Sequence, residues 1–298
     1  MSQHAIIASE NDLCGEAPLW DASGGCLYWS DCVGLKFRRY HPEGNRVDTL
    51  REGLGINGLA FNAPGGFVVT NAEGIWLWDG AQQTRLIASE VDGAKCQMND
   101  CIADARGRVL GGSYFYDPSG NYPLGKLFSV DPTGRVTILD EGFHLSNGLG
   151  FSPDNRTLYF ADSAARTIYA YDYDLERGAV ANRRVFVQAP ATDGLPDGLT
   201  VDAEGYVWSA QWYGSCVVRY APDGREDRRI SLPAKQISSV MFGGTDLKDL
   251  FVTSAGQPEP MPIMPPGYDP ASGTIGGCLY RLRPGPAGRV ENRAGIRI

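Results

Sequence analysis

The sequence predicts an all-β fold, a six-bladed β-propeller with four antiparallel strands in each blade. The first observation is a six-residue frame that occurs six times, in which a polar residue is followed by apolar residues and a turn residue. The copies begin at Glu16, Asn57, Asn99, Asn147, Asp197 and Ser238. They return at intervals of about 40 to 50 residues, the kind of period that marks propellers and solenoids.

The second observation is a series of short runs, rich in β-branched and aromatic residues, that follows each frame. Second strands are expected at residues 26–30, 67–70, 108–112, 157–161, 206–209 and 250–253. Third strands are expected at 36–40, 74–78, 126–130, 167–171, 216–220 and 277–282. More polar fourth strands follow, as at 135–139, 183–187 and 228–232. Turns such as 131–134 and 221–224 separate them, with Pro at the second position and Gly at the last.

The two ends of the chain fit the same plan. The sixth repeat has only a weak fourth strand after Pro284, and residues 5–9 form a strand with no repeat of their own. We therefore expect the N-terminal strand to complete the last blade and close the ring, because an open ring would leave strand edges exposed. Residues 1–298 are predicted to be a single propeller domain.

Composition excludes several classes of function. The formal net charge of −8 repels a phosphate backbone, so no nucleic-acid partner is expected. The N-terminus has no basic region followed by an apolar core, and no apolar run approaches the roughly 18 residues that span a bilayer. We expect a cytoplasmic protein with no membrane partner, and its seven cysteines are expected to be reduced.

The six opening residues are the candidate functional set, because the first strand of each propeller blade lines the central axis. All six carry a side-chain oxygen and none is Cys or His, an inventory that suits a hard divalent cation. Pairs such as Asn57-Gly58 and Asp197-Gly198 are also favoured in tight turns, which is the alternative interpretation of each one taken singly. All six residues occupy the same position in the repeat, which favours a shared cation site over six separate turns.

These residues carry a resemblance to a known family. The strongest motifs are Gly15-Glu16-Ala17-Pro18, Asn99-Asp100, residues 146–154 with 158–163, and Pro196-Asp197-Gly198-Leu199. Over essentially its whole length the chain resembles the senescence-marker-protein/gluconolactonase/luciferin-regenerating-enzyme family of six-bladed propeller lactonases, which includes regucalcin. The resemblance implies that Glu16, Asn147 and Asp197 bind the metal, that Asn99 contacts substrate or a metal-bound water, and that Asp197 is also the general base.

One position departs from the family pattern. Similar sugar lactonases usually have Arg two places before the Asn of the Asn-Asp pair, and here that place is Gln97. Gln forms hydrogen bonds but carries no charge and has no guanidinium fork, so a less polar or non-sugar lactone enters consideration. Insertions at 115–125 and 257–274 interrupt the third and sixth repeats, as lids or as tolerated surface loops. The first holds Tyr116, which we expect to contact substrate by stacking.

The expected reaction is hydrolysis of a small lactone, in which a cation acts as Lewis acid and Asp197 takes a proton from water. Calcium is the first expectation for the metal, with zinc, magnesium, manganese and iron(II) as alternatives. Three rival functions are a phosphotriesterase-like hydrolase on the same metal site, a calcium-binding regulatory protein without turnover, and an interaction scaffold. A scaffold has no need of carboxylates at one axis, which argues against it.

Overall fold

The computed structural model describes residues 4–81, 84–115 and 122–297. The regular structure of these residues consists of strands, β1 to β26. Six sheets of four antiparallel strands follow one another along the chain, which makes the fold a six-bladed β-propeller and confirms the predicted class. No helix in the described part of the chain is long and apolar enough to cross a membrane.

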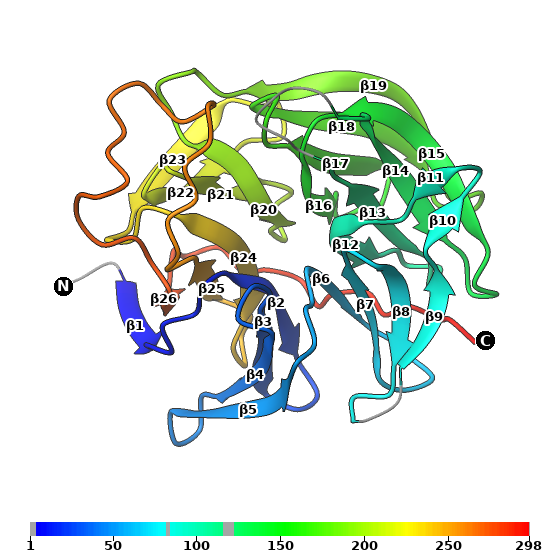
Figure 1. Ribbon diagram of the computed structural model, residues 1–298, viewed down its shortest axis with the longest axis horizontal. Helices are drawn as coiled ribbons and strands as arrows, with labels where there is room; N and C mark the ends of the chain where they lie inside the picture. The colour runs from blue at the N-terminus through cyan, green and yellow to red at the C-terminus, as the bar shows by residue number, and fades with distance from the viewer. Residues whose placement is uncertain (1–3, 82–83, 116–121, 298) are drawn as a thin grey trace. The chain divides into compact units, whose positions relative to one another are not determined.

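The chain divides into two compact units. The first comprises Met1–Ile56 and Val187–Val290, and the second comprises Asn57–Phe186 and Glu291–Ile298. Each unit holds three of the six sheets (Figure 1). The candidate residues Glu16, Asp197 and Ser238 belong to the first unit, and Asn57, Asn99 and Asn147 belong to the second. The two units are therefore described one after the other.

The first unit contains the first, fifth and sixth sheets. The first is β2 (Gly15–Asp21), β3 (Cys26–Asp31), β4 (Lys36–His41) and β5 (Arg46–Glu52). The fifth is β20 (Leu195–Val201), β21 (Val207–Trp212), β22 (Cys216–Tyr220) and β23 (Glu226–Ser231). The sixth has the order β1-β26-β25-β24, from β24 (Ile237–Gly243), β25 (Asp249–Ser254), β26 (Leu279–Leu282) and β1 (His4–Ala8).

The N-terminal strand completes the sixth sheet, as the sequence predicts. It runs antiparallel to β26, with His4 opposite Leu282 and Ile6 opposite Tyr280. Ala8 and Leu279 lie in one hydrophobic cluster with Trp20 and Phe251, so the strand contributes to the core as well as to the ladder. The edge of β26 is thereby paired, which removes a site for unwanted strand addition.

The second unit contains the second, third and fourth sheets. The second is β6 (Gly58–Phe61), β7 (Phe67–Asn71), β8 (Gly74–Trp78) and β9 (Thr84–Ala88). The third is β12 (Met98–Ala103), β13 (Val109–Ser113), β14 (Gly125–Val130) and β15 (Val136–Phe143). The fourth is β16 (Ser146–Phe151), β17 (Thr157–Asp162), β18 (Thr167–Asp174) and β19 (Ala179–Gln188). A small hairpin, β10 (Glu90–Val91) with β11 (Ala94–Lys95), joins the second sheet to the third.

The strands differ in burial according to their place in the sheet. First strands such as β16 and β20 are buried along their whole length, whereas fourth strands such as β19 and β23 are mostly exposed. In the first unit β24 contacts both β2 and β20, and in the second unit β12 contacts both β6 and β16. Each unit therefore brings three first strands together along one side.

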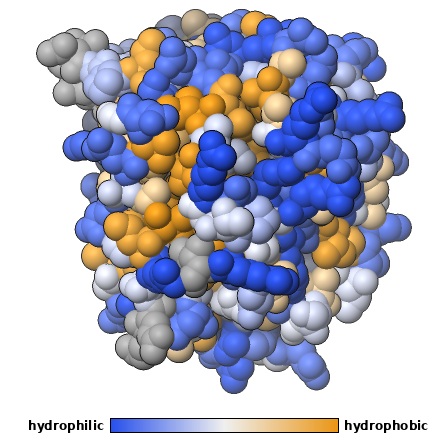
Figure 2. All heavy atoms as spheres, turned by 90° about the vertical axis from the view of Figure 1, so that its right-hand side faces the viewer, coloured by the Kyte–Doolittle hydropathy of each residue, from blue (hydrophilic) through white to orange (hydrophobic). Residues whose placement is uncertain are grey.

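Hydrophobic clusters between adjacent sheets hold each unit together. In the first unit Trp208 of the fifth sheet packs edge-to-face on Phe242 of the sixth, with ring centroids 5.7 Å apart. In the second unit, apolar side chains also reach the surface on the side that carries β9, β10 and β15, where Figure 2 shows them among polar ones. Partly buried apolar residues that pack against the core of this unit include Leu77, Ile87, Val91, Val136 and Ile138.

The predicted turns are confirmed at atomic detail. In the turn after β14, the Gly134 N–H donates to the Asp131 carbonyl at 2.9 Å, and Gly134 has a φ of 84°. Gly224 repeats this geometry after β22, with a φ of 85°. Because other residues rarely adopt such angles, glycine is needed at these two positions.

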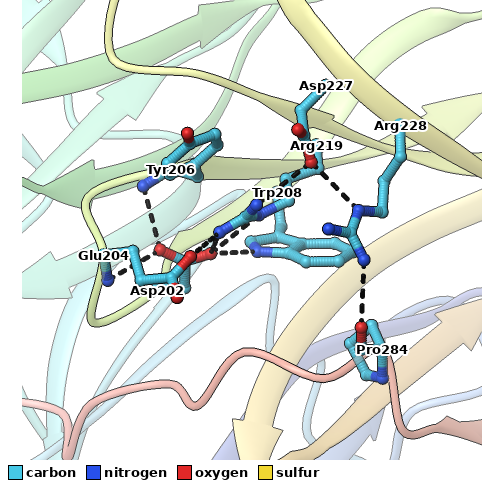
Figure 3. A network of polar contacts seen from close by, with 8 residues as sticks. All are labelled: Asp202, Glu204, Tyr206, Trp208, Arg219, Asp227, Arg228 and Pro284. Atoms are coloured by element: carbon cyan, nitrogen blue, oxygen red, sulfur yellow. Dashed lines mark hydrogen bonds and ion pairs between the residues drawn. The ribbon is translucent and has the colours of Figure 1, made fainter.

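A buried ion-pair network fastens the hairpin between β20 and β21, at the end of β20 that lies away from Asp197 (Figure 3). The Asp202 carboxylate is fully buried and accepts hydrogen bonds from Arg219 and from the Trp208 indole N–H. The Arg219 guanidinium lies 3.6 Å from the centroid of the Tyr206 ring and also pairs with Asp227. Buried charges need such partners, and here both the charge and its donors are satisfied.

Residues beyond the last sheet belong to the core of the second unit. Ala294 forms a parallel bridge with Asn62 and is fully buried, as is Ile296. The Asn62 side chain donates from Nδ2 to the Ile296 carbonyl at 3.1 Å and accepts at Oδ1 from the Ile296 N–H at 2.9 Å. One side chain therefore satisfies both backbone groups of a buried residue.

Candidate functional site

Five of the six predicted opening residues lie at the head of the first strand of their sheet, and Asn57 directly precedes β6. Five of these six strands have a register shift at that point, between Glu16 and Leu19, Met98 and Asp100, Ser146 and Leu149, Pro196 and Leu199, and Ile237 and Ser239. A bulge leaves a residue out of the ladder and turns its side chain, and bulges are common beside active sites. The bulge, which the sequence did not reveal, leaves Asn99, Asn147, Asp197 and Ser238 out of the ladder, whereas Glu16 is paired with Ser30 and the bulge follows it.

The alternative interpretation of the Asn-Gly and Asp-Gly pairs as tight turns is wrong. Gly58 and Gly198 are strand residues of β6 and β20. A Cβ on Gly198 would lie 2.1 Å from Ser239 Oγ and 2.7 Å from its Cα, on the adjacent first strand. A Cβ on Gly58 would lie 2.7 Å from the Cys101 backbone nitrogen. Glycine is needed here for close approach of neighbouring first strands.

In the first unit, the charges of the candidate carboxylates Glu16 and Asp197 both act on the Cys14 thiol. Glu16 is half-buried in β2, and Asp197 is buried in β20 with 3% of its surface exposed. The pKa of the Cys14 thiol is raised well above its ordinary value, first by a hydrogen bond with Cys32, then by burial, and also by the negative charges of Cys32, Glu16 and Asp197. Both carboxylates are thus close enough to Cys14 for their charges to be felt there.

The Ser238 side chain forms hydrogen bonds within the protein that stabilise the fold. Its hydroxyl donates to the Gly15 carbonyl at 2.5 Å and contacts Thr253 Oγ1 at 3.0 Å. This bond ties the head of β24 to the residue that precedes Glu16. Ser238 therefore holds the candidate ligand's strand in place.

In the second unit, the two candidate amides are oriented by their donor ends. Asn147 is buried, and its Nδ2 donates to Ser163 Oγ at 3.2 Å. Asn99 is half-buried, and its Nδ2 donates to the Ser146 carbonyl at 3.1 Å, which links β12 to β16. Both bonds use the amide nitrogen, so the amide oxygen, the atom that binds cations, is directed to the other side.

Gln97 is half-buried and lies immediately before β12. Its carbonyl accepts a hydrogen bond from the Tyr114 N–H at 3.1 Å, and Tyr114 in turn bridges Leu145. Gln97 and Asn99 thus belong to the same end of the third sheet. Tyr116, the predicted stacking residue, lies outside the described residues, as do 116–121 of the first insertion.

The comparison with protein families then identifies the chain. A family model described as the SMP-30/gluconolactonase/LRE-like region matches residues 14–256. The chain belongs to this family.

Individual relatives agree with the assignment. Pentonolactonase XacC from Haloferax volcanii is 38% identical over 288 residues, covering 95% of this chain and 95% of the relative. The structure of a luciferin-regenerating enzyme has a TM-score of 0.85 and 26% identity, and the match covers 98% of this chain and 99% of that one. The structure of regucalcin from Agrobacterium tumefaciens, described as a calcium-binding protein, has a TM-score of 0.83 and 25% identity, with 98% and 97% covered.

The second insertion of this SMP-30/gluconolactonase/LRE-like chain is held against the fifth and sixth sheets of the first unit. The Gln236 side chain accepts from the Glu259 N–H at 3.2 Å and donates to the Gln257 carbonyl at 2.7 Å. The Tyr213 ring packs on the Tyr268 ring, with centroids 4.7 Å apart. The insertion packs on its own unit through these contacts, and its role as a lid stays a prediction.

One titratable residue of this family member was not singled out by the sequence. Asp100 follows Asn99, and burial, with the charge of Glu291, raises its pKa to about 7, against a hydrogen bond from the Cys101 N–H that lowers it. A carboxyl with such a pKa is half-protonated near neutral pH, where a general acid or base works best. Its place in the Asn-Asp motif was visible, but its burial was not.

The donor chemistry of the candidate residues fits a hard cation. In the described ranges, no three Asp, Glu, His or Cys side chains gather as a metal-binding group. The predicted set contains only two such residues, Glu16 and Asp197, and adds the amide of Asn147. Carboxylate and amide oxygens are the ligands that calcium takes, usually with water molecules completing the shell.

Proposed function

We propose that the protein is a metal-dependent lactonase that hydrolyses the ester bond of a small, sugar-derived lactone. The observation that carries the proposal is a bulge at the head of five first strands, which leaves Asn99, Asn147, Asp197 and Ser238 out of the ladder and begins directly after Glu16. The family relationship supports the reaction class, since one relative is named as a pentonolactonase and the family description includes gluconolactonase.

Glu16, Asn147 and Asp197 are the proposed metal ligands, and calcium is the proposed metal. Their oxygen donors support this choice, and so does the description of the Agrobacterium relative as a calcium-binding protein. When bound, such a cation would supply Lewis-acid polarisation of a lactone carbonyl.

The chain's own residues perform the remaining tasks. Asp197 accepts a proton from the attacking water, and its burial keeps bulk water away from that carboxylate. Asn99 and Gln97 bind the substrate through amide hydrogen bonds, which orient a lactone without adding charge. Gln97 carries no positive charge, so the proposed substrate is a neutral lactone.

The test is a lactone panel followed with a pH indicator, because each ring opening releases one proton from the new carboxylic acid. We expect calcium-dependent turnover of neutral pentono- and hexonolactones that is lost with a chelator. Asp197→Ala should lower kcat by about 10²- to 10⁴-fold, the usual contribution of a general base. Asp223→Ala, an exposed turn position on the same sheet, is the matched control and should retain activity.

Other outcomes would assign one of the rival functions. Chelator-insensitive turnover, or full activity in Asp197→Ala, would contradict the mechanism. Tight calcium binding with no lactone opened would identify a regulatory protein instead. Turnover of organophosphates in place of lactones would identify the phosphotriesterase-like alternative.

A further inference from the structure

Two cysteines face each other at the end of the β2–β3 hairpin. The register pairs Gly15 with Asp31 and Glu16 with Ser30, so Cys14 stands opposite Cys32 one step beyond the ladder. The Cys32 N–H donates to the Cys14 carbonyl at 2.9 Å, which fixes this pairing. Residues opposite each other in an antiparallel pair have Cα atoms about 5.5 Å apart when they share such a bond, within the 4.4–6.8 Å range of disulfides.

The backbone on both sides of the thiol pair is anchored to one buried carboxylate. Asp31 accepts from the Leu13 N–H at 3.1 Å, from the Cys14 N–H at 3.0 Å and from the Gly34 N–H at 2.8 Å. These bonds hold the segments before β2 and after β3 in position. The two cysteines are therefore preorganised for a bond that needs little backbone movement.

The pair lies closer to solvent than most of the other cysteines do. Cys14 and Cys32 are half-buried, whereas Cys26, Cys96, Cys101 and Cys216 are buried. Their neighbours Leu13 and Val33 are 42% and 50% exposed, so solvent reaches this end of the hairpin. A small reagent can approach these sulfurs more easily than the four buried ones.

We propose that Cys14 and Cys32 are a redox modification site that a low-molecular-weight disulfide, such as oxidised glutathione, converts into an intrachain disulfide. The Cys32 thiolate attacks a sulfur of the reagent and releases the first glutathione as its thiolate, leaving a mixed disulfide on Cys32. Cys14 then passes its proton to the released glutathione thiolate, and its sulfur displaces the remaining glutathione. Two protein thiols are oxidised, one reagent disulfide is reduced to two thiols, and the protein's two protons are transferred to these products.

The modification is coupled to the candidate metal site, a consequence that rests on the proposed function. Cys14 lies two residues before Glu16, directly ahead of β2, so a shift of its backbone is transmitted through Gly15 to Glu16. Forming the bond brings the Cβ atoms from the 4.5–5.5 Å of a cross-strand pair to about 3.8 Å. We expect this contraction to displace the Glu16 carboxylate and to weaken calcium binding by about tenfold. That is the lower end of the loss in metal affinity seen when a residue that positions a metal ligand is disturbed.

The experiment treats the folded protein with oxidised glutathione, blocks the remaining thiols and maps its peptides. A protease that cleaves after acidic residues separates Cys14 from Cys26 and Cys32, because Glu16, Asp21 and Asp31 lie between them. The expected product is a peptide pair joined between Cys14 and Cys32, lighter by two hydrogens and separated by dithiothreitol. Calcium titration of the reduced and oxidised proteins measures the coupling.

Two variants and a control make the result decisive. Cys14→Ser and Cys32→Ser should each abolish the linked peptides and the oxidation-dependent change in calcium affinity. Cys278→Ser removes another half-buried thiol of the same unit and should leave both unchanged. Absence of the 14–32 link, or glutathione adducts without it, would overturn the proposal. If the link forms but neither form binds calcium, the proposed metal site fails while the modification site stands. Unchanged calcium affinity would refute the coupling alone.

Discussion

At the residue scale, the environment of Asp100 separates it from an ordinary surface carboxyl. Its side chain is held by the Cys101 N–H at 2.7 Å, yet burial still raises its pKa to about 7. The unfolded chain would have a carboxyl with a pKa near 3.9. The folded state therefore binds this proton more tightly than the unfolded state does.

Asp100 should make stability fall as pH rises. A raised folded pKa contributes stability that is fully present below about pH 4 and is lost as pH rises through about 7. Relative to wild type, Asp100→Asn should gain about 2–4 kcal/mol of unfolding free energy between pH 4 and pH 8. Urea unfolding of both proteins across this range checks it, and a difference independent of pH would contradict the raised pKa.

At the element scale, the strands depend on side-chain networks at their ends. The hairpin between β20 and β21 is fastened by Asp202 and Arg219, whose atoms approach to 2.7 Å and whose side chains are 0% and 4% exposed (Figure 3). The Arg184–Asp172 pair lies on exposed strand surface, with the two atoms 2.8 Å apart. The two pairs have nearly equal distances but very different burial.

Removing the arginine from each pair should have unequal effects. Arg219→Leu leaves the Asp202 charge buried without its cation, and should lower the unfolding free energy by about 3–5 kcal/mol. Arg184→Leu removes only a solvated pair and should change it by less than about 1 kcal/mol. Chemical denaturation measures both, and similar values for the two variants would show that burial does not control this interaction.

Much of the element level could be predicted from the sequence, because strand runs and turn residues are local signals. The frames, the turns closing at Gly134 and Gly224, and the pairing of the N-terminal strand with the sixth sheet follow from repeats and backbone preferences. The bulges could not be predicted, since a register shift depends on the partner strand. The proximity of Cys14 to Cys32 was missed for the same reason, and the burial of Asp100 depends on surrounding sheets.

At the scale of the whole molecule, the segment after the last sheet completes the second unit. Ala294 and Ile296 are fully buried in the same cluster as Val68, Val109 and Phe128. Their backbone is bound through Asn62 and through the Ala63 N–H, which donates to the Ala294 carbonyl at 2.7 Å. This short segment is therefore part of the core and not an appendage.

Asn62→Ala should loosen this segment. The substitution leaves the Ile296 N–H and C=O without their side-chain partners, and each such group costs about 1–3 kcal/mol. Amide hydrogen exchange at Ile296 should become much faster, and the melting temperature should fall. Asn292→Ala removes one longer bond, 3.3 Å to the Ala103 carbonyl, and should have a smaller effect. Unchanged exchange at Ile296 in Asn62→Ala would show that the clamp is dispensable.

The buried position of residues 294–296 has a consequence for synthesis. The ribosome makes β6 to β9 and β12 to β15 long before it makes this segment, yet their shared core includes Ala294 and Ile296. A nascent chain that has emerged as far as β19 therefore presents an uncovered apolar surface on sheets that are otherwise formed. We expect such chains to be retained by chaperones until translation reaches residue 296. Comparing chaperone binding to nascent chains stalled after β19 with binding to released full-length chains tests this.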